Sequence, residues 1–320
     1  MREKGMRCLR VCGFLLLLGA VAAALSLLFA PKNNRQDFGM GEMKANGILT
    51  EPENTIDVIA VGNSECATAI APMVLWRERG ITAYNCGTAG QHLYDTLHYL
   101  RQALENQRPS VVILETDAVF QECQLSDSLF AKLEELIPLL RYHDRWKSLR
   151  PEDLGPVEYT WRDEAKGHLF YLKAEAACPE DYMKPCPDIR LAPRWNRQCL
   201  KEIIALCEKN GAELLLVSTP SAINWNYVNH NGIEALAQEF GLAYVDLNLL
   251  TGEVPVNWAT DTKDGGDHMN AWGAEKVSSY LARYLSEQYG LADHRGESGY
   301  EGWDEDLKRY EEGWTQEGQQ

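Results

Sequence analysis

The sequence predicts an α/β fold, in which helices cover both faces of a central parallel sheet and one transmembrane helix precedes the folded domain. Two observations predict it. Short apolar runs suited to buried strands alternate with helical patterns along residues 55–290. A separate run, residues 11–30, contains no charged residue. With 320 residues and 45% hydrophobic content, the chain can bury a core of this kind.

The N-terminal run 11–30 is long enough to cross the roughly 30 Å hydrocarbon layer as a helix. Four basic residues and one acidic residue precede it in the segment 1–10. The positive-inside rule therefore predicts a single-pass plasma-membrane protein with a cytoplasmic N-terminus and an extracytoplasmic main domain. A cleaved signal peptide is the alternative, because Ala22, Ala23 and Ala24 are small. The uncleaved anchor is favoured, since the apolar region of a signal peptide usually spans about 7–15 residues.

After this run, the alternation of elements defines the predicted domain. Five apolar runs are predicted to be strands: 56–61, 81–84, 111–114, 214–217 and 243–245. Helical patterns lie between or after them: 71–79, 93–105, 196–209, 233–240 and 271–289. Such βα repetition predicts a flavodoxin-like, three-layer α/β/α sandwich with a parallel sheet.

Three segments depart from this alternation. Residues 31–54 are polar and glycine-containing, and we expect a tether between the membrane and the domain. Residues 119–194 interrupt the βα rhythm with a helical stretch at 126–143 and an aromatic segment, which predicts an insertion over the strand ends. Residues 291–320 form an acidic tail, expected to be solvated or loosely docked.

Charge and cysteine usage limit the possible partners. The net charge is −16, and because residues 1–10 contribute +3, the part after the anchor carries −19. Such a surface repels nucleic acid, so no nucleic-acid partner is expected. The nine cysteines form no CxxC pair and no metal-ligand spacing. Cys178 and Cys186 could pair across a loop in an oxidising compartment, whereas Cys66 and Cys86 fit small core positions.

Three turns carry residues suited to catalysis, each where a strand ends or a helix begins. Ser64 follows the first strand in the turn Gly62-Asn63-Ser64. The second strand leads into a loop with Gly87 and Gly90, whose N–H groups could face a ligand. His268 lies in a glycine-rich, acidic turn before the last helix, with Asn270 as a helix cap. Parallel strands place their carboxyl ends at one sheet edge, so a serine, a donor loop and a histidine base could meet there.

This order of serine, glycine loop, acid and histidine resembles the SGNH/GDSL hydrolase superfamily. The resemblance is closer to its membrane-anchored bacterial branch, which includes D-alanyl-transfer and polysaccharide O-acetyl-transfer proteins, and covers roughly residues 55–290. It implies that Ser64 is the nucleophile and that His268 takes its proton. It also implies that N–H groups of Ser64 and of Gly87, or less favourably Gly90, stabilise the oxyanion.

Two positions depart from the family pattern. The third sequence motif of the family normally supplies an asparagine that donates to the oxyanion. The corresponding strand here ends Leu114-Glu115-Thr116-Asp117 instead. Asn63 or Gln91 could replace that oxyanion donor.

The usual acid lies three residues before the histidine, and Gly265 occupies that position. Asp264 and Asp267 are both candidates to orient His268. Asp264 is slightly favoured, because an adjacent side chain projects away in an extended turn.

The resemblance implies a serine esterase or an acyltransferase that acts on ester-linked acyl groups and needs no metal or organic cofactor. Its substrate would be an acylated carbohydrate or cell-envelope polymer, and a transferase would need a membrane partner that donates the acyl group. Gln91, in the loop after the second strand, and Asn224 and Trp225, after the fourth strand, could line the substrate pocket. Asn224 and Trp225 could instead make turns and cover the core. A catalytically inactive binding or structural module of the cell envelope is the alternative.

Overall fold

The computed structural model describes residues 2–317 and the side chains of residues 4–314. The chain divides into two compact units. The first contains the chain up to Met43 together with the segment 125–161, and the second contains the segment 44–124 together with the chain from Arg162 onward. All candidate catalytic residues lie in the second unit.

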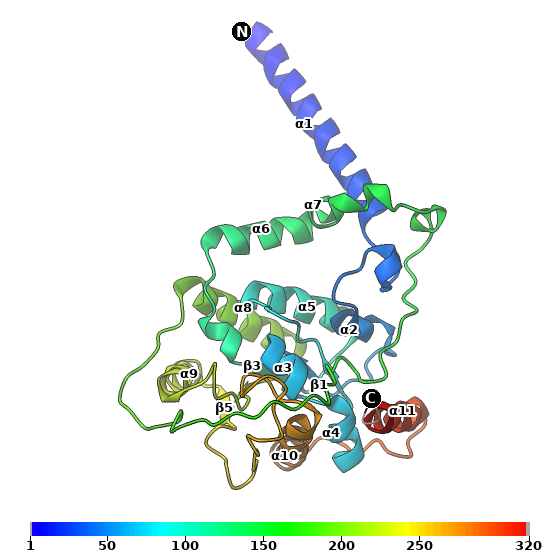
Figure 1. The fold of residues 1–320 in the computed structure, drawn as a ribbon. Helices are drawn as coiled ribbons and strands as arrows, with labels where there is room; N and C mark the ends of the chain where they lie inside the picture. Colours follow the sequence, from blue (N-terminus) through cyan, green and yellow to red (C-terminus); the bar gives the residue numbers. More distant parts are fainter. Residues whose placement is uncertain (1, 318–320) are drawn as a thin grey trace. The chain divides into compact units, whose positions relative to one another are not determined.

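The second unit is built on a five-stranded parallel sheet with the order β2-β1-β3-β4-β5 (Figure 1). Its strands are β1 (Val58–Val61), β2 (Ala83–Asn85), β3 (Val111–Glu115), β4 (Glu213–Ser218) and β5 (Ala243–Asp246). In the centre, Ile59 of β1 pairs with Tyr84 of β2 on one side and with Val112 of β3 on the other. The predicted parallel α/β sheet is confirmed, and its strand order is the flavodoxin-like one.

Helices flank this sheet on both faces. They are α3 (Ser64–Ala69), α4 (Pro72–Arg79), α5 (Leu93–Asn106), α8 (Arg194–Asn210), α9 (Tyr227–Phe240), α10 (Ala271–Tyr289) and α11 (Glu301–Glu317). Short turns at α2 (Met43–Asn46), η2 (Gly47–Thr50) and η3 (Asp117–Phe120) complete the set. Helix α5 packs on α8, whereas α10 packs on α3 and α4.

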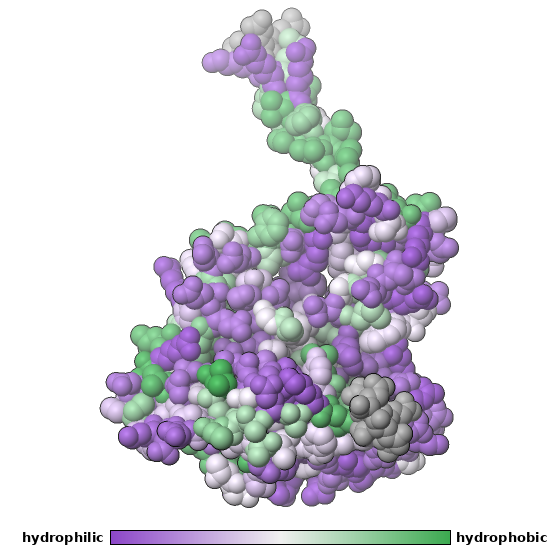
Figure 2. Space-filling view, in the orientation of Figure 1, coloured by the Kyte–Doolittle hydropathy of each residue, from purple (hydrophilic) through white to green (hydrophobic). Residues whose placement is uncertain are grey.

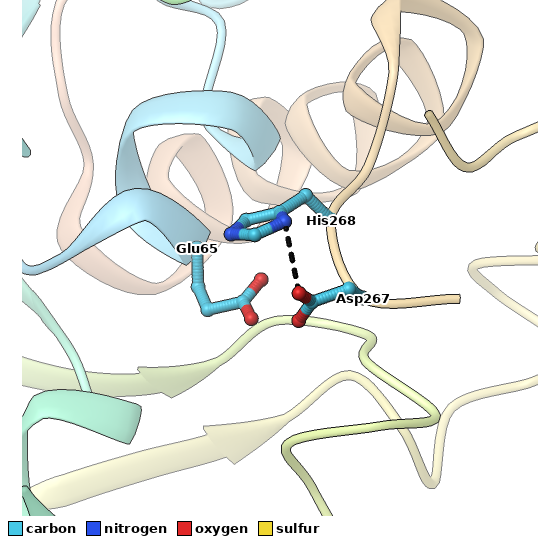
Figure 3. A group of neighbouring side chains, drawn as sticks. All are labelled: Glu65, Asp267 and His268. Atoms are coloured by element: carbon cyan, nitrogen blue, oxygen red, sulfur yellow. Dashed lines mark ion pairs between the residues drawn. The ribbon is translucent and has the colours of Figure 1, made fainter. Parts of the chain in front are cut away.

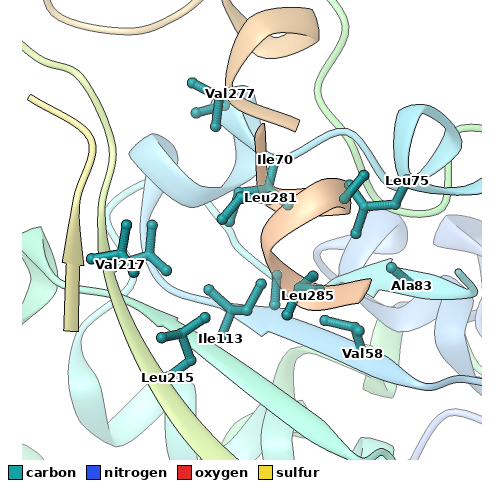
Figure 4. Close-up of a cluster of buried hydrophobic side chains, with 14 of the residues drawn as sticks. Val58, Ile70, Leu75, Ala83, Ile113, Leu215, Val217, Val277, Leu281 and Leu285 are labelled. Atoms are coloured by element: carbon teal, nitrogen blue, oxygen red, sulfur yellow. The ribbon is translucent and has the colours of Figure 1, made fainter. Parts of the chain in front are cut away.

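The core on the α10 side of the sheet is aliphatic. Figure 4 shows side chains of the sheet facing those of α10, with Leu75 of α4 beside them. Val58, Ile113 and Leu215 come from neighbouring strands, and Leu281 comes from α10; all are almost completely buried. Since burial of each such side chain contributes about 1.5–3 kcal/mol, this packing holds the start of α10, and with it the turn of His268, against the sheet.

The first unit contains α1 (Arg2–Phe29), α6 (Leu125–Leu136), α7 (Pro138–Tyr142) and the short turns η1 (Gln36–Phe38), η4 (His143–Lys147) and η5 (Pro151–Leu154). Helix α1 is long and apolar enough to cross a membrane. The helix expected at 126–143 is instead broken after Ile137, because Pro138 lacks an N–H group and starts α7 at its first position.

Parts of the expected tether and of the acidic tail, the latter expected to be solvated or loosely docked, pack in the second unit. Ile48 and Leu49, in the expected tether, are buried. The acidic tail forms α11, which buries Trp303 and Tyr310. Trp303 lies 5.3 Å from Trp76 of α4 between ring centroids. The tail therefore gains the apolar contacts that its composition alone does not suggest.

A buried ion pair holds α11 in place. Nζ of Lys166, fully buried, lies 2.6 Å from Glu51 and 2.8 Å from Asp306 of α11. Replacing Lys166 by alanine is expected to destabilise the fold by about 3–5 kcal/mol, because the buried Glu51 carboxylate loses the ammonium that neutralises it. Asp306, by contrast, keeps its salt bridge to Arg162. Urea unfolding would measure the change. Lys173→Ala is the matched control, since its salt bridge is exposed and its loss should leave the midpoint unchanged; equal midpoints for both variants would contradict the prediction.

Candidate active site

Ser64 lies at the carboxyl end of β1, as the first residue of α3. The strand leads into Gly62, which has a φ of 153°. A Cβ atom on Gly62 would lie 2.7 Å from Cβ of Glu115, so only glycine fits this turn. Asn63 caps α3, accepting a hydrogen bond at its Oδ1 from the N–H of Glu65 at 3.0 Å. The strand-to-helix turn thus presents Ser64 at the sheet edge.

His268 connects Ser64 to a carboxylate. Its Nε2 lies 2.8 Å from Oγ of Ser64, and its Nδ1 lies 2.8 Å from Oδ2 of Asp264. The backbone N–H of His268 donates to the other oxygen of Asp264 at 2.8 Å. A carboxylate at Nδ1 fixes the proton there, so Nε2 is the nitrogen that can accept the serine proton. Ser64, His268 and Asp264 have the mutual geometry of a serine-hydrolase triad.

Asp264 is held in its ionised form. Partial burial acts to raise the pKa of Asp264, but hydrogen bonds from Lys263 and from His268 outweigh it and lower this pKa below its ordinary value. Nζ of Lys263 donates to Oδ2 at 2.6 Å. The carboxylate therefore keeps its charge at neutral pH, where it can orient the imidazole and stabilise an imidazolium.

Asp267, the other candidate acid, lies farther from the ring nitrogen. Its Oδ2 is 3.4 Å from Nδ1 of His268. Figure 3 shows Asp267 and Glu65 converging beside the His268 ring. Asn224 donates to both carboxylates, at 2.7 Å to Oε1 of Glu65. The geometry favours Asp264 over Asp267 as the partner of Nδ1, and it places Asn224 in the shell around the triad.

Ligand atoms of Glu65, Asp267 and His268 lie within 4.8 Å of one another, close enough for a cation. Both ring nitrogens of His268 already have partners in Ser64 and Asp264. The two carboxylates share the amide of Asn224. Hydrogen bonds within the chain account for this cluster, and we assign no metal to it.

The structure corrects one of the expected oxyanion donors, Gly87, and shows that a second, Asn63, uses one of its two amide N–H groups within the chain. The N–H of Gly87 donates to Oδ1 of Asn85 at 2.9 Å, so this donor is already used. Nδ2 of Asn63 donates to Oδ2 of Asp117 at 2.7 Å. The third expected donor is the N–H of Ser64, which lies in the first turn of α3, where helical N–H groups have no intrahelical partner.

Two expected substrate contacts are also corrected. Gln91 is buried, and its amide accepts from Thr88 and donates to Thr96, both at 2.9 Å. Trp225 is buried, and its indole donates to Asp246 at 3.0 Å. Both side chains therefore bond other residues of the chain and stabilise their loops. Of the three residues expected to bind substrate, Asn224 alone lies beside the triad.

Sequence reasoning missed a group of buried carboxylates around Ser64. Burial raises the pKa of Glu65 well above its ordinary value, and the nearby Glu115 charge adds to the effect. Burial, with the Asp117 carboxylate, raises the pKa of Glu115 to about 8. The sequence feature that could have indicated this group is the acidic end of β3, where Glu115 and Asp117 stand in place of the asparagine of the family pattern.

Glu115→Gln is expected to change how stability depends on pH. A folded-state pKa of about 8, above the ordinary value of 4.5, means that the folded wild type loses stability as pH rises between these values. The glutamine variant lacks this titration. Its stability relative to wild type should therefore increase from about pH 5 to about pH 9, by at least about 1 kcal/mol or roughly 2–4 °C in Tm.

Thermal unfolding of both proteins across this pH range would measure the difference. Glu122→Gln, at an exposed position, is the matched control and should follow wild type throughout. A Glu115→Gln curve parallel to that of wild type would contradict the raised pKa.

The sequence matches no protein-family model and no curated protein. Among solved structures, the chain is similar to a lipase/acylhydrolase from Enterococcus faecalis, with a TM-score of 0.39 and 11% identity over 73% of this chain and 97% of that one. It is also similar to a GDSL-like lipase from Bacteroides thetaiotaomicron, with a TM-score of 0.35 and 14% identity over 72% of this chain and 88% of that one. The chain has the parallel α/β fold that its sequence predicts.

Proposed function

We propose that this protein is a membrane-anchored, extracytoplasmic serine esterase or acyltransferase of the SGNH type. The observation that carries the proposal is the chain of hydrogen bonds from Ser64 through His268 to Asp264, with 2.8 Å at each step. A hydroxyl, an imidazole and an ionised carboxylate in this order form an activated nucleophile. Ser64 lies 204 residues before His268 in the sequence, and the two meet at the carboxyl edge of the sheet, where α/β proteins bind ligands.

In the proposed reaction, Oγ of Ser64 attacks the ester carbonyl carbon while Nε2 of His268 takes its proton. The resulting oxyanion is stabilised by the N–H of Ser64, and Asp264 stabilises the imidazolium. As the tetrahedral intermediate collapses, the ester C–O bond breaks and the leaving oxygen takes the proton from His268. Water or a sugar hydroxyl, deprotonated by the same nitrogen, then attacks the acyl carbon. The bond from that carbon to Oγ of Ser64 breaks, and Oγ takes the proton back from Nε2, which regenerates the enzyme.

A cavity of the second unit, whose lining does not include the triad residues, supports an acylated carbohydrate or cell-envelope polymer as the substrate. It has a volume of about 500 Å³ and is lined by Pro220, Asn248, Tyr182 and Trp258, among others. The Trp258 ring also lies next to Gly266, two residues before His268. Aromatic faces stack on sugar rings, and amides bond their hydroxyl groups.

The anchoring part of the proposal rests on α1. Its apolar side chains are exposed and its length suffices to cross a bilayer. The basic residues before the apolar run favour a cytoplasmic N-terminus and an extracytoplasmic second unit. If the acceptor is a sugar hydroxyl, a partner membrane protein would supply the acyl group, because a single span cannot transport it.

A fluorophosphonate probe tests the catalytic proposal, because it reacts only with an activated serine. The full-length protein in detergent should be labelled, and mass spectrometry of its peptides should place the adduct on Ser64. The same protein should hydrolyse p-nitrophenyl acetate. Absence of both labelling and hydrolysis would refute the proposed enzymatic activity.

One observation favours a second candidate, a catalytically inactive module that binds an envelope polymer. The N–H of Gly87 and one of the two amide N–H groups of Asn63 are engaged within the chain, which leaves fewer groups for an oxyanion. Such a module would bind acylated polymer without releasing acid. Binding of an acylated glycan that is unchanged in Ser64→Ala, together with no turnover by wild type, would favour this candidate.

A further inference from the structure

Helix α6 turns its apolar side chains outward. Five of them are exposed by between 42% and 77%: Leu125, Leu129, Phe130, Leu133 and Leu136. Their spacing places them on one side of the helix. Ala131, by contrast, is buried on the other side. A helix of a water-soluble domain buries its apolar side, so α6 has the opposite arrangement.

Helix α6 is connected to the end of α1 through α7, within the first unit. Helix α7, which follows α6 after Pro138, packs against α1. The N–H of Leu139 donates to Oγ of Ser26 at 3.2 Å, and Phe29 is buried. Along residues 4–21 of α1, by contrast, the side chains are exposed. Figure 1 shows α6 and α7 running across the C-terminal end of α1, and in Figure 2 hydrophobic atoms lie along the same elements.

The charges of this segment also differ from those of the rest of the chain. Residues 125–150 contain five basic and four acidic side chains, a net charge of +1, whereas the whole chain carries −16. Trp146 is exposed, with Nζ of Lys147 5.2 Å from its ring centroid. Tryptophan is enriched at membrane interfaces, and basic side chains there attract anionic headgroups. An anionic membrane surface would therefore repel this segment less than it repels the acidic remainder of the chain.

We propose that α6 lies in the bilayer interface, with Leu129, Phe130 and Leu133 among the lipid acyl chains. This inference rests on α1 crossing the bilayer, which is part of the proposed function. Lipid is the occupant because α7 joins α6 to α1, and both α6 and the proposed membrane helix α1 expose apolar side chains. An amphipathic helix in the interface would give the first unit a second attachment beside its anchor.

The test uses the full-length protein in liposomes of phosphatidylcholine that contain a photoactivatable acyl-chain lipid. After irradiation, mass spectrometry maps the lipid adducts on peptides. We expect adducts on α1 and on the α6 peptide, and none on the exposed Ile189 and Leu191 of the second unit. Replacing both Leu129 and Leu133 by asparagine should lower adducts on α6 by about tenfold or more while leaving those on α1 unchanged. The matched Leu→Met double variant should retain them.

The possible outcomes separate this inference from the anchor. Adducts on α1 without adducts on α6 would overturn the interfacial helix and leave the anchor standing. Adducts on neither helix would overturn both. Chemical cross-links between two copies through α6, with no lipid adducts there, would make a second copy the occupant and would likewise overturn the proposal.

Discussion

Replacing Ser64 by alanine is expected to lower kcat/KM for ester hydrolysis by about 10⁴–10⁶-fold. The variant lacks the atom that forms the acyl-enzyme, whereas His268 and Asp264 keep their own hydrogen bond. Turnover of p-nitrophenyl acetate would measure the loss, and fluorophosphonate labelling should disappear with it. Ser64 is half-buried, and its Oγ bonds His268. Removing this oxygen takes away no core packing, so the fold should tolerate the change.

The matched control is Ser286→Ala, in the last turn of α10, at the opposite end of that helix from His268. It should retain wild-type turnover, and both variants should unfold at the wild-type temperature within about 1 °C. If Ser64→Ala kept its activity while folded, another residue would be the nucleophile. Loss of activity together with a lowered Tm would instead point to a structural role for Ser64.

The sheet and the two ends of the triad could be predicted because each depends on local sequence. The five strands are short apolar runs between turns, and a run such as 111–114 has few other ways to bury its side chains. Ser64 and His268 follow a strand and precede a helix, respectively. Once the strands are parallel, their carboxyl ends must share one edge, so the approach of these two residues follows from topology.

The oxyanion donors could not be predicted, because their availability depends on side chains from other parts of the sequence. Whether the N–H of Gly87 is free depends on the rotamer of Asn85, and whether Asn63 is free depends on Asp117 at the end of another strand. Likewise, the tail docks because Lys166 lies buried where Asp306 can reach it. The composition of 291–320 carries no information on that partner.

The choice between Asp264 and Asp267, which the sequence left open, leads to the second large effect. Asp264→Asn is expected to lower kcat by about 10⁴-fold, because the amide no longer holds the proton at Nδ1 and cannot stabilise an imidazolium. Asp267→Asn, the matched control, should lower it by less than about tenfold, because its oxygen lies 3.4 Å from Nδ1 against 2.8 Å for Asp264. Steady-state hydrolysis with the pure variants would measure both.

The reverse ranking would make Asp267 the partner of His268 in the reacting enzyme and would mean that the turn rearranges when substrate binds. Comparable losses of kcat in both variants would mean that both carboxylates act on Nδ1, either independently or as one unit. The double variant then decides, because independent contributions multiply whereas a shared one does not. Since Lys263 bonds Asp264 and Asn224 bonds Asp267, the structure predicts separate supports and therefore losses that multiply.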